Sequence, residues 1–306
     1  MQSPSLPRRE ALASYACAFV FIIAMVAVAA ALGDREIVLP EIAAMAVALW
    51  AYREQSWMRR PEAIFLWPSI TAVMGFGTNL LALPFAAKLA IVLITMLSFF
   101  ALFRYSLAPA LATGFLPIVT NATEASFLIS IGVTTFVLML GVAAVRLRKP
   151  ADRSAPLNPR AMLAYGTITL AWMGLAWAAG YPQLGLIPPV TVVVYESLHM
   201  KMYSAKMALK QAAVLTLSAT IGVALFLTLD SWVLIAALDL LLMAGLLRLF
   251  RMRVPAVYAF PFLAFVFPVE AVRNLPIAAA LICTFSLGLV VLYRRWLEPR
   301  PSLVAS

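Results

Sequence analysis

The chain has 306 residues, of which 64% are hydrophobic and only 12% are charged. Soluble domains carry about 25% charged residues, so this composition excludes an ordinary soluble protein. The net charge of +10 does not indicate a nucleic-acid partner, because the basic residues stand in short clusters at the ends of apolar segments, where they set membrane topology. We therefore expect an all-α, polytopic membrane protein whose partners are the lipid bilayer and a small solute. The sequence carries no signal for the oligomeric state.

The first apolar segment, residues 11–32, follows Arg8 and Arg9, as the core of a signal peptide would. It is longer than the roughly 7–15 apolar residues of such a core, and it has a counterpart in the second half of the chain. We expect it to be kept as the first membrane helix.

Each half of the chain contains six apolar segments. In the first half they cover residues 11–32, 37–52, 63–83, 84–103, 106–120 and 125–145, and in the second half 161–179, 186–195, 211–229, 232–247, 254–267 and 275–293. The second and fifth segments of each half are short and begin near proline. At about 1.5 Å per residue, the dozen residues after Pro40 or Pro109 cover about 18 Å, which is less than the roughly 30 Å of the hydrocarbon core.

Matched positions recur in the same order in the two halves, at offsets of 146 to 148 residues. They are Gly33 and Gly180, Pro40 and Pro188, Gly75 and Gly222, Arg104 and Arg251, Pro109 and Pro255, Glu124 and Glu270, and Arg148 and Arg294. We interpret this as an internal duplication, with parallel membrane repeats at 9–148 and 160–296 and a polar cytoplasmic linker at 149–159. Each repeat also reads long–short–long twice, which is the hydropathy pattern of two inverted three-helix units.

Two proline-led stretches in each half carry a family resemblance. They are Leu39-Pro40-Glu41 with Pro109-Ala110 after Arg104, and Ile187-Pro188-Pro189 with Pro255-Ala256 after Arg251. In this order of elements the chain resembles the HPP family of integral membrane proteins, as two diverged tandem copies. The family's His-Pro-Pro motif is not kept, since the corresponding positions read Leu107-Ala108-Pro109 and Arg253-Val254-Pro255. The resemblance implies transport of small anions such as nitrite.

Ionisable residues inside a membrane are costly and are therefore candidates for function. Asp239 lies about nine residues into segment 232–247, and Lys88 lies in the corresponding region of the first half. We consider two interpretations for Asp239, a role in transport or an interhelical ion pair or hydrogen bond that only fixes packing, with Lys88 as the possible ion-pair partner. Lys88 is nearer a helix end, where its ammonium group could reach the interface.

The short segments locate a candidate site. Proline suits the first turn of a helix, so we expect the helix starts at Pro40 and Pro109 to meet from opposite sides near the midplane, as do those at Pro188 and Pro255. Facing helix N-termini form a partial positive centre that could hold a small anion.

The two halves differ at this site. Glu41 argues against a plain anion site in the first half, unless it is protonated or carries protons. Pro189 and Thr191 make the second half the better anion candidate. We predict a polar cavity lined by Pro188, Thr191 and Pro255, with Asp239 nearby.

Other chemistry finds little support in the sequence. The single histidine, His199, and two separated cysteines, Cys17 and Cys283, make a zinc or haem site implausible. There is no phosphate-binding loop, dinucleotide motif or nucleophile elbow, so we expect no metal, no cofactor and no enzymatic activity. Tryptophans near segment ends are interpreted as interface anchors, and they are Trp50, Trp57, Trp67, Trp232 and Trp296.

The leading hypothesis is a membrane transporter or channel-like carrier for a small solute. It rests on the duplication, the short proline-led segments and the lack of a soluble catalytic or ATP-binding domain. The alternatives are a non-catalytic structural or assembly protein of the membrane and, less favoured, a lipid-modifying membrane enzyme.

Topology gives the first testable prediction. The basic clusters, such as Arg248-Arg251-Arg253, all fall on one side if all twelve segments behave as crossings. We expect both termini in the cytoplasm, with a bacterial inner membrane as the location. Reporter fusions at residues 3 and 304 should read cytoplasmic, and a reporter after Asp34 should read external. A C-terminal reporter on the external side would contradict the parallel repeats.

Overall fold

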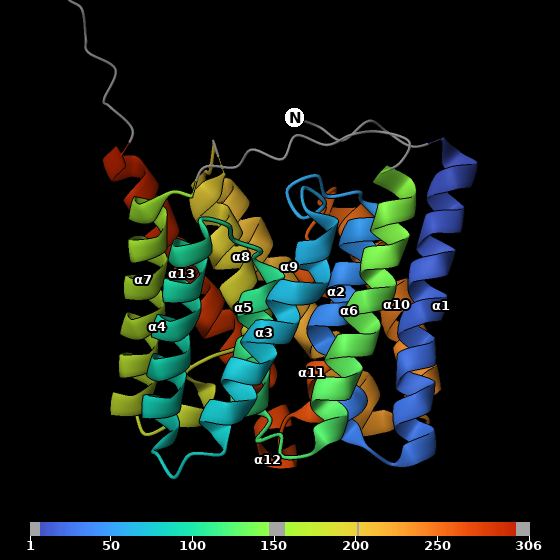
Figure 1. Ribbon diagram of the computed structural model, residues 1–306, viewed down its shortest axis with the longest axis horizontal. Coiled ribbons are helices and arrows are strands. Elements are labelled where there is room, and N and C mark those ends of the chain that lie inside the picture. The colour runs from blue at the N-terminus through green and yellow to red at the C-terminus, as the bar shows by residue number, and fades with distance from the viewer. Residues whose placement is uncertain (1–6, 147–156, 201, 298–306) are drawn as a thin grey trace, which may run out of the picture.

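The computed structural model describes residues 7–146, 157–200 and 202–297, and every regular element within these ranges is a helix (Figure 1). Arg148, most of the expected linker at 149–159 and both terminal reporter positions lie outside the described residues. The predicted all-α class is confirmed for the described part of the chain.

The first half contains four long helices and two short ones. The long helices are α1 (Arg8–Leu32), α3 (Pro61–Asn79), α4 (Phe85–Phe103) and α6 (Ala125–Arg146). The short ones are α2 (Pro40–Ala46), which continues into a π-helical turn η2 (Val47–Ala51), and α5 (Pro109–Val119). A 3₁₀ turn, η1 (Arg35–Ile37), precedes α2.

The second half follows a similar order. Its long helices are α7 (Pro159–Ala178), α9 (Ala205–Thr228), α10 (Trp232–Phe250) and α13 (Leu275–Leu297). Its short elements are η3 (Pro182–Leu184), α8 (Pro188–His199), η4 (Pro255–Tyr258), α11 (Leu263–Val266) and α12 (Val269–Val272).

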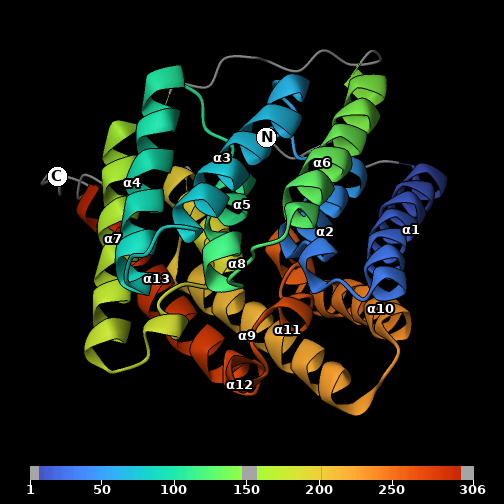
Figure 2. The same ribbon diagram turned by 60° about the horizontal axis from the view of Figure 1, so that its bottom comes forward.

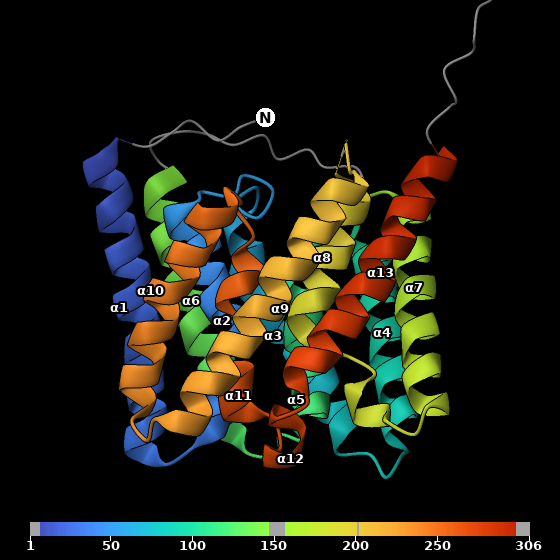
Figure 3. The same ribbon diagram turned by 180° about the vertical axis from the view of Figure 1, so that it is seen from behind.

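Seven of the long helices in the described residues are long and apolar enough to cross a membrane. They are α1, α4, α6, α7, α9, α10 and α13. Of these, α1, α4, α6 and α7 stand upright in the view, whereas α9 and α13 are tilted (Figures 1 and 3). Large apolar side chains are exposed on them, among them Leu12 (71%), Leu163 (73%) and Leu209 (72%). Such a surface is stable against lipid and not against water, so the chain is a multi-pass membrane protein.

The short helices α2, α5 and α8 occupy the interior of the bundle (Figure 2). Every residue of α2 and of α5 is buried. α5 packs against α3 and α8, and α2 packs against η4. All four proline-led elements begin at the predicted residue, with proline in the first turn. There the missing N–H group costs no helical hydrogen bond.

Two short segments are less regular than predicted. Segment 254–267 divides into η4 and α11, because Pro261 has no N–H group and its ring disfavours a continuous helix. The end of α2 widens into a π turn, in which the Tyr52 N–H group donates to the Val47 carbonyl at 2.9 Å.

Two glycines allow the long and short helices to cross closely. A Cβ atom on Gly75 of α3 would meet the backbone oxygen of Gly114 on α5. A Cβ atom on Gly222 of α9 would meet the backbone of Pro261 in the same way. These contacts are with backbone, so no side chain can move aside.

The crossing at Gly75 can be tested with a matched control in the same helix. We expect Gly75→Ala to lower the free energy of unfolding by about 1–3 kcal/mol, as overpacking does. Gly77→Ala should be neutral or slightly stabilising, because a Cβ atom there meets nothing within 4 Å and alanine favours helix. Thermal unfolding in detergent would measure both. Equal effects at the two positions would contradict the close crossing.

Candidate functional site

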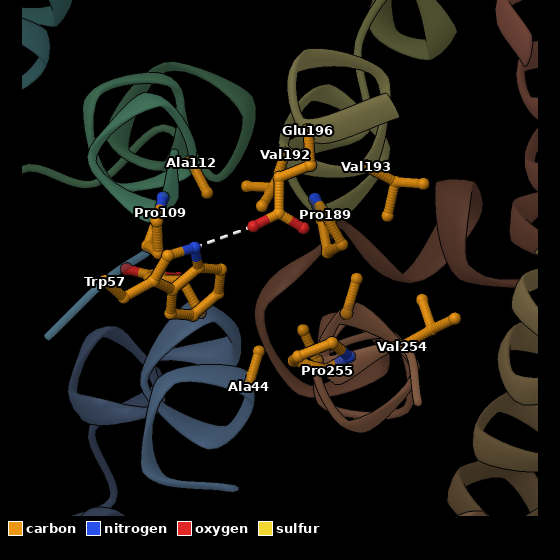
Figure 4. A pocket seen from close by; sticks show the side chains of 13 residues that line it. Ala44, Trp57, Pro109, Ala112, Pro189, Val192, Val193, Glu196, Val254 and Pro255 are labelled. Atoms are coloured by element: carbon orange, nitrogen blue, oxygen red, sulfur yellow. Dashed lines mark hydrogen bonds between the residues drawn. The ribbon is translucent and has the colours of Figure 1, made fainter. Parts of the chain in front are cut away.

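A small cavity lies where the four proline-led elements meet (Figure 4). Its volume is about 20 Å³, enough for one water molecule. Each of α2, α5, α8 and η4 contributes a residue from its first turn, and these residues are Glu41, Pro109, Pro189 and Pro255. The remaining lining residues are Ala44, Trp57, Ala112, Val192, Val193, Glu196, Val254, Ala256 and Ala259. The lining is therefore apolar apart from two carboxyl groups and one indole N–H group.

Glu41 is the more isolated of the two acids. It is 3% exposed, and neither of its carboxyl oxygens has a hydrogen-bond partner among the described residues. It directly follows Pro40, so the start of α2 fixes its position. An unpartnered carboxyl group in an apolar interior is costly to fold, and such a cost is typical of a residue kept for function.

Glu196 also lines the cavity, and it has a hydrogen-bond partner. Its Oε1 atom accepts a hydrogen bond of 2.6 Å from the indole Nε1 atom of Trp57 (Figure 4). Trp57 lies in the link between α2 and α3 and is 3% exposed, whereas Glu196 lies near the end of α8. The bond thus joins the two halves of the chain next to the cavity.

The helical period explains which residues of α8 face this cavity. Pro189, Val192, Val193 and Glu196 all line it, and their spacing of three, four and seven residues places them on one helix face. Thr191 lies on another face. It lines a separate cavity of about 10 Å³ together with Thr169 and Ser286, and its hydroxyl donates to the Pro188 carbonyl at 2.7 Å.

The predicted grouping of Pro188, Thr191 and Pro255 is therefore divided in the structure. Of these three residues only Pro255 lines the cavity between the short helices. Pro40 and Pro188 are buried at the helix starts, immediately before the lining residues Glu41 and Pro189. Pro109, Pro189 and Pro255 do share one cavity.

Asp239 and Lys88 are not paired with each other. The Lys88 ammonium group donates to the Asn79 carbonyl at 2.5 Å. Asp239 is fully buried in α10, and its carboxyl oxygens have no partner among the described residues. The physical reason is placement, because α4 packs against α7 whereas α10 packs against α1 and α9. Asp239 also does not line the cavity.

The two polar lining residues besides Glu41 were not predicted from the sequence. Trp57 was interpreted as an interface anchor, yet its ring is buried against the cavity. Glu196 stands seven residues after Pro189. This spacing on a proline-started helix is the signal that could have identified it.

No family model, curated protein or solved structure matches this chain. The site is therefore interpreted from its own geometry.

The isolation of Glu41 predicts a gain in stability when its charge is removed. We expect Glu41→Gln to raise the free energy of unfolding by about 1 kcal/mol or more at pH 8, because an unpartnered buried charge costs more than a neutral amide. Glu62→Gln, at an exposed position, makes the same charge change and should have little effect. Thermal unfolding in detergent would measure the difference. A destabilised Glu41→Gln variant would indicate a partner for this carboxyl group.

Proposed function

We propose that the protein is a membrane carrier for a small solute, and that the cavity between the four short helices is its binding place. The observation that carries the proposal is the unpartnered carboxyl group of Glu41, buried at the point where four helix starts converge. An acidic residue inside the membrane is energetically costly, so its presence there indicates a functional role. Short helices that start inside the bundle are also the device with which many carriers build sites.

The proposed architecture is a pair of parallel repeats. It is supported by the order of elements, since α1, α2, α3, α4, α5 and α6 correspond to α7, α8, α9, α10, η4 with α11, and α13. Contacts between the halves are reciprocal. α1 packs on α10 while α4 packs on α7, and α2 packs on η4 while α8 packs on α5. Such exchange is expected of a pseudo-two-fold axis along the membrane normal.

Special backbone positions support the same pairing. Arg104 and Arg251, which end α4 and α10, have φ angles of 50° and 53°. Gly33 and Gly180, which follow α1 and α7 closely, also have positive φ angles. Left-handed backbone is uncommon for arginine, so its recurrence at matched positions favours a common origin.

The cavity lies on this proposed axis. Ala44 corresponds to Val192, and Pro109 corresponds to Pro255. Glu41 has Pro189 as its counterpart, so at this pair of positions only the first half carries an acid. A carrier gains from this difference, because Glu41 can hold a proton without facing a second copy of itself across the cavity.

The chemistry that we propose couples a small solute to protons. Converging helix N-termini favour an anion, and an ionised Glu41 opposes one. A protonated Glu41 removes that opposition, so solute and proton would enter together and leave together. The resemblance to a family of small-anion transporters fits this arrangement.

The hydrogen bond between Trp57 and Glu196 has a place in the cycle. It lies at the ends of the cavity-lining segments of α2 and α8, away from their proline-led starts. The link that carries Trp57 also carries Arg53, Arg59 and Arg60, so this bond closes the cavity toward the basic, cytoplasmic side. Opening that side requires the bond to break, which would let the two halves rock against each other.

Flux in proteoliposomes tests the proposal. The wild-type protein should take up one member of a panel of small ions, with nitrite and formate among the anions and potassium as a cation control, faster when a pH gradient is imposed. Glu41→Gln should reduce the gradient-driven part at least tenfold, because the amide cannot exchange a proton. Glu62→Gln should retain it.

The same assay separates the alternatives. If the protein is a structural or assembly protein, the wild type should show no flux with any gradient. Glu41→Gln should then leave the protein's structural role unchanged. Asp239→Asn provides a further comparison. Normal folding with reduced flux would place Asp239 in the transport cycle, whereas loss of folded protein would assign it to packing.

A further inference from the structure

A basic groove lies where α9 begins and α10 ends, apart from the cavity between the short helices. Its volume is about 370 Å³. One wall consists of the end of α8 and the start of α9, and the other wall is the link between α10 and η4. The lining residues are Met200, Ser204, Lys206, Met207, Lys210, Gln211, Arg251, Met252, Arg253 and Val254.

The charge of the groove has one sign. Four of its lining residues are cationic and none is acidic. All four cations are exposed, and within residues 7–146, 157–200 and 202–297 none of them forms an ion pair. They are Lys206, Lys210, Arg251 and Arg253. The groove can therefore accept an anion without first breaking an internal contact.

Hydrogen bonds fix both walls. Gln211 is buried, and its Oε1 atom accepts from the Tyr203 hydroxyl at 2.6 Å. Ser204 caps α9 by accepting from the Met207 N–H group at 3.2 Å. On the other wall Arg251 is held in left-handed backbone, where its N–H group donates to the Arg248 carbonyl at 3.2 Å. The four cations therefore lie on backbone that is held in place by hydrogen bonds.

The surroundings of the groove are those of a bilayer surface. α9 and α10 are both candidate membrane spans, and the groove lies where α9 begins and α10 ends, on the side where α1 begins and α13 ends (Figure 3). Just beyond it, Leu209 of α9 and Leu249 of α10 are 72% and 78% exposed. Apolar surface therefore continues from the charged groove along both helices.

We propose that this groove binds the phosphate headgroup of an anionic phospholipid, whose acyl chains lie along α9 and α10. Lys206 and Lys210 hold the phosphate from one wall, and Arg251 and Arg253 hold it from the other. A topology signal alone requires positive charge on this side, but it requires neither a groove nor cations on facing walls. Cationic pockets between membrane helices are suited to such headgroups.

Native mass spectrometry in detergent micelles tests the proposal with phosphatidylglycerol as the probe. We expect wild-type protein to retain one phosphatidylglycerol more strongly than phosphatidylcholine. The double variant Lys206→Gln/Arg253→Gln, which removes one cation from each wall, should weaken this binding roughly 25-fold, about fivefold for each charge. The control Arg59→Gln/Arg104→Gln removes two cations from the corresponding end of the first half and should leave it unchanged.

A second arm separates a lipid from a free phosphate. Thermal unfolding of the wild-type protein should shift upward with phosphatidylglycerol and not with inorganic phosphate at equal concentration. An equal shift with inorganic phosphate would overturn the lipid assignment. Equal weakening by the two double variants would show that only overall charge matters, and it would overturn the proposal as well. Because both measurements record binding, their outcome does not depend on the proposed carrier function.

Discussion

The hydrocarbon core of a bilayer offers no water to backbone groups, and this constraint governs the arrangement of the whole chain. Every N–H and C=O group at membrane depth must find a partner in the protein. The short helices need irregular backbone before their prolines, and that backbone includes Leu39, Leu107 and Ile187, all of which are almost fully buried. It is tolerated because long helices enclose it. The short helices can therefore start inside the membrane, with a cavity between them, because the long helices surround them.

Much of this arrangement could be predicted from individual residues. The starts of the short elements at Pro40, Pro109, Pro188 and Pro255 follow from the fixed φ angle and missing donor of proline. The facing of side chains could not be predicted in the same way. In a soluble protein the polar side of a helix reveals its buried side, whereas here α2 and α5 are buried all around and, apart from Glu41 and Thr113, apolar. On α8 only the spacing of Glu196 from Pro189 then distinguishes their side from the side that bears Thr191.

Long-range contacts could not be predicted from the sequence for a different reason. Trp57 and Glu196 are 139 positions apart, and a tryptophan near the end of an apolar segment is most simply explained as an interface anchor. Only the packing of the two halves turns its N–H group toward a carboxylate. Similarly, Lys88 and Asp239 have complementary charges, but the helices that carry them pack against different neighbours. Charge alone identifies candidates for a pair, and topology decides between them.

Under the proposed duplication, Glu41 and Pro189 occupy matched positions on either side of one cavity, and Glu196 is matched by an apolar residue, Ala48. Two identical subunits related by a two-fold axis must present the same residue from both sides. In such a dimer a second glutamate would face Glu41 across a very small space, and the two like charges would repel each other. Joining the halves in one polypeptide removes this restriction. A single chain can contribute one acid from each half to a site on its own axis, with neither acid obliged to face a copy of itself.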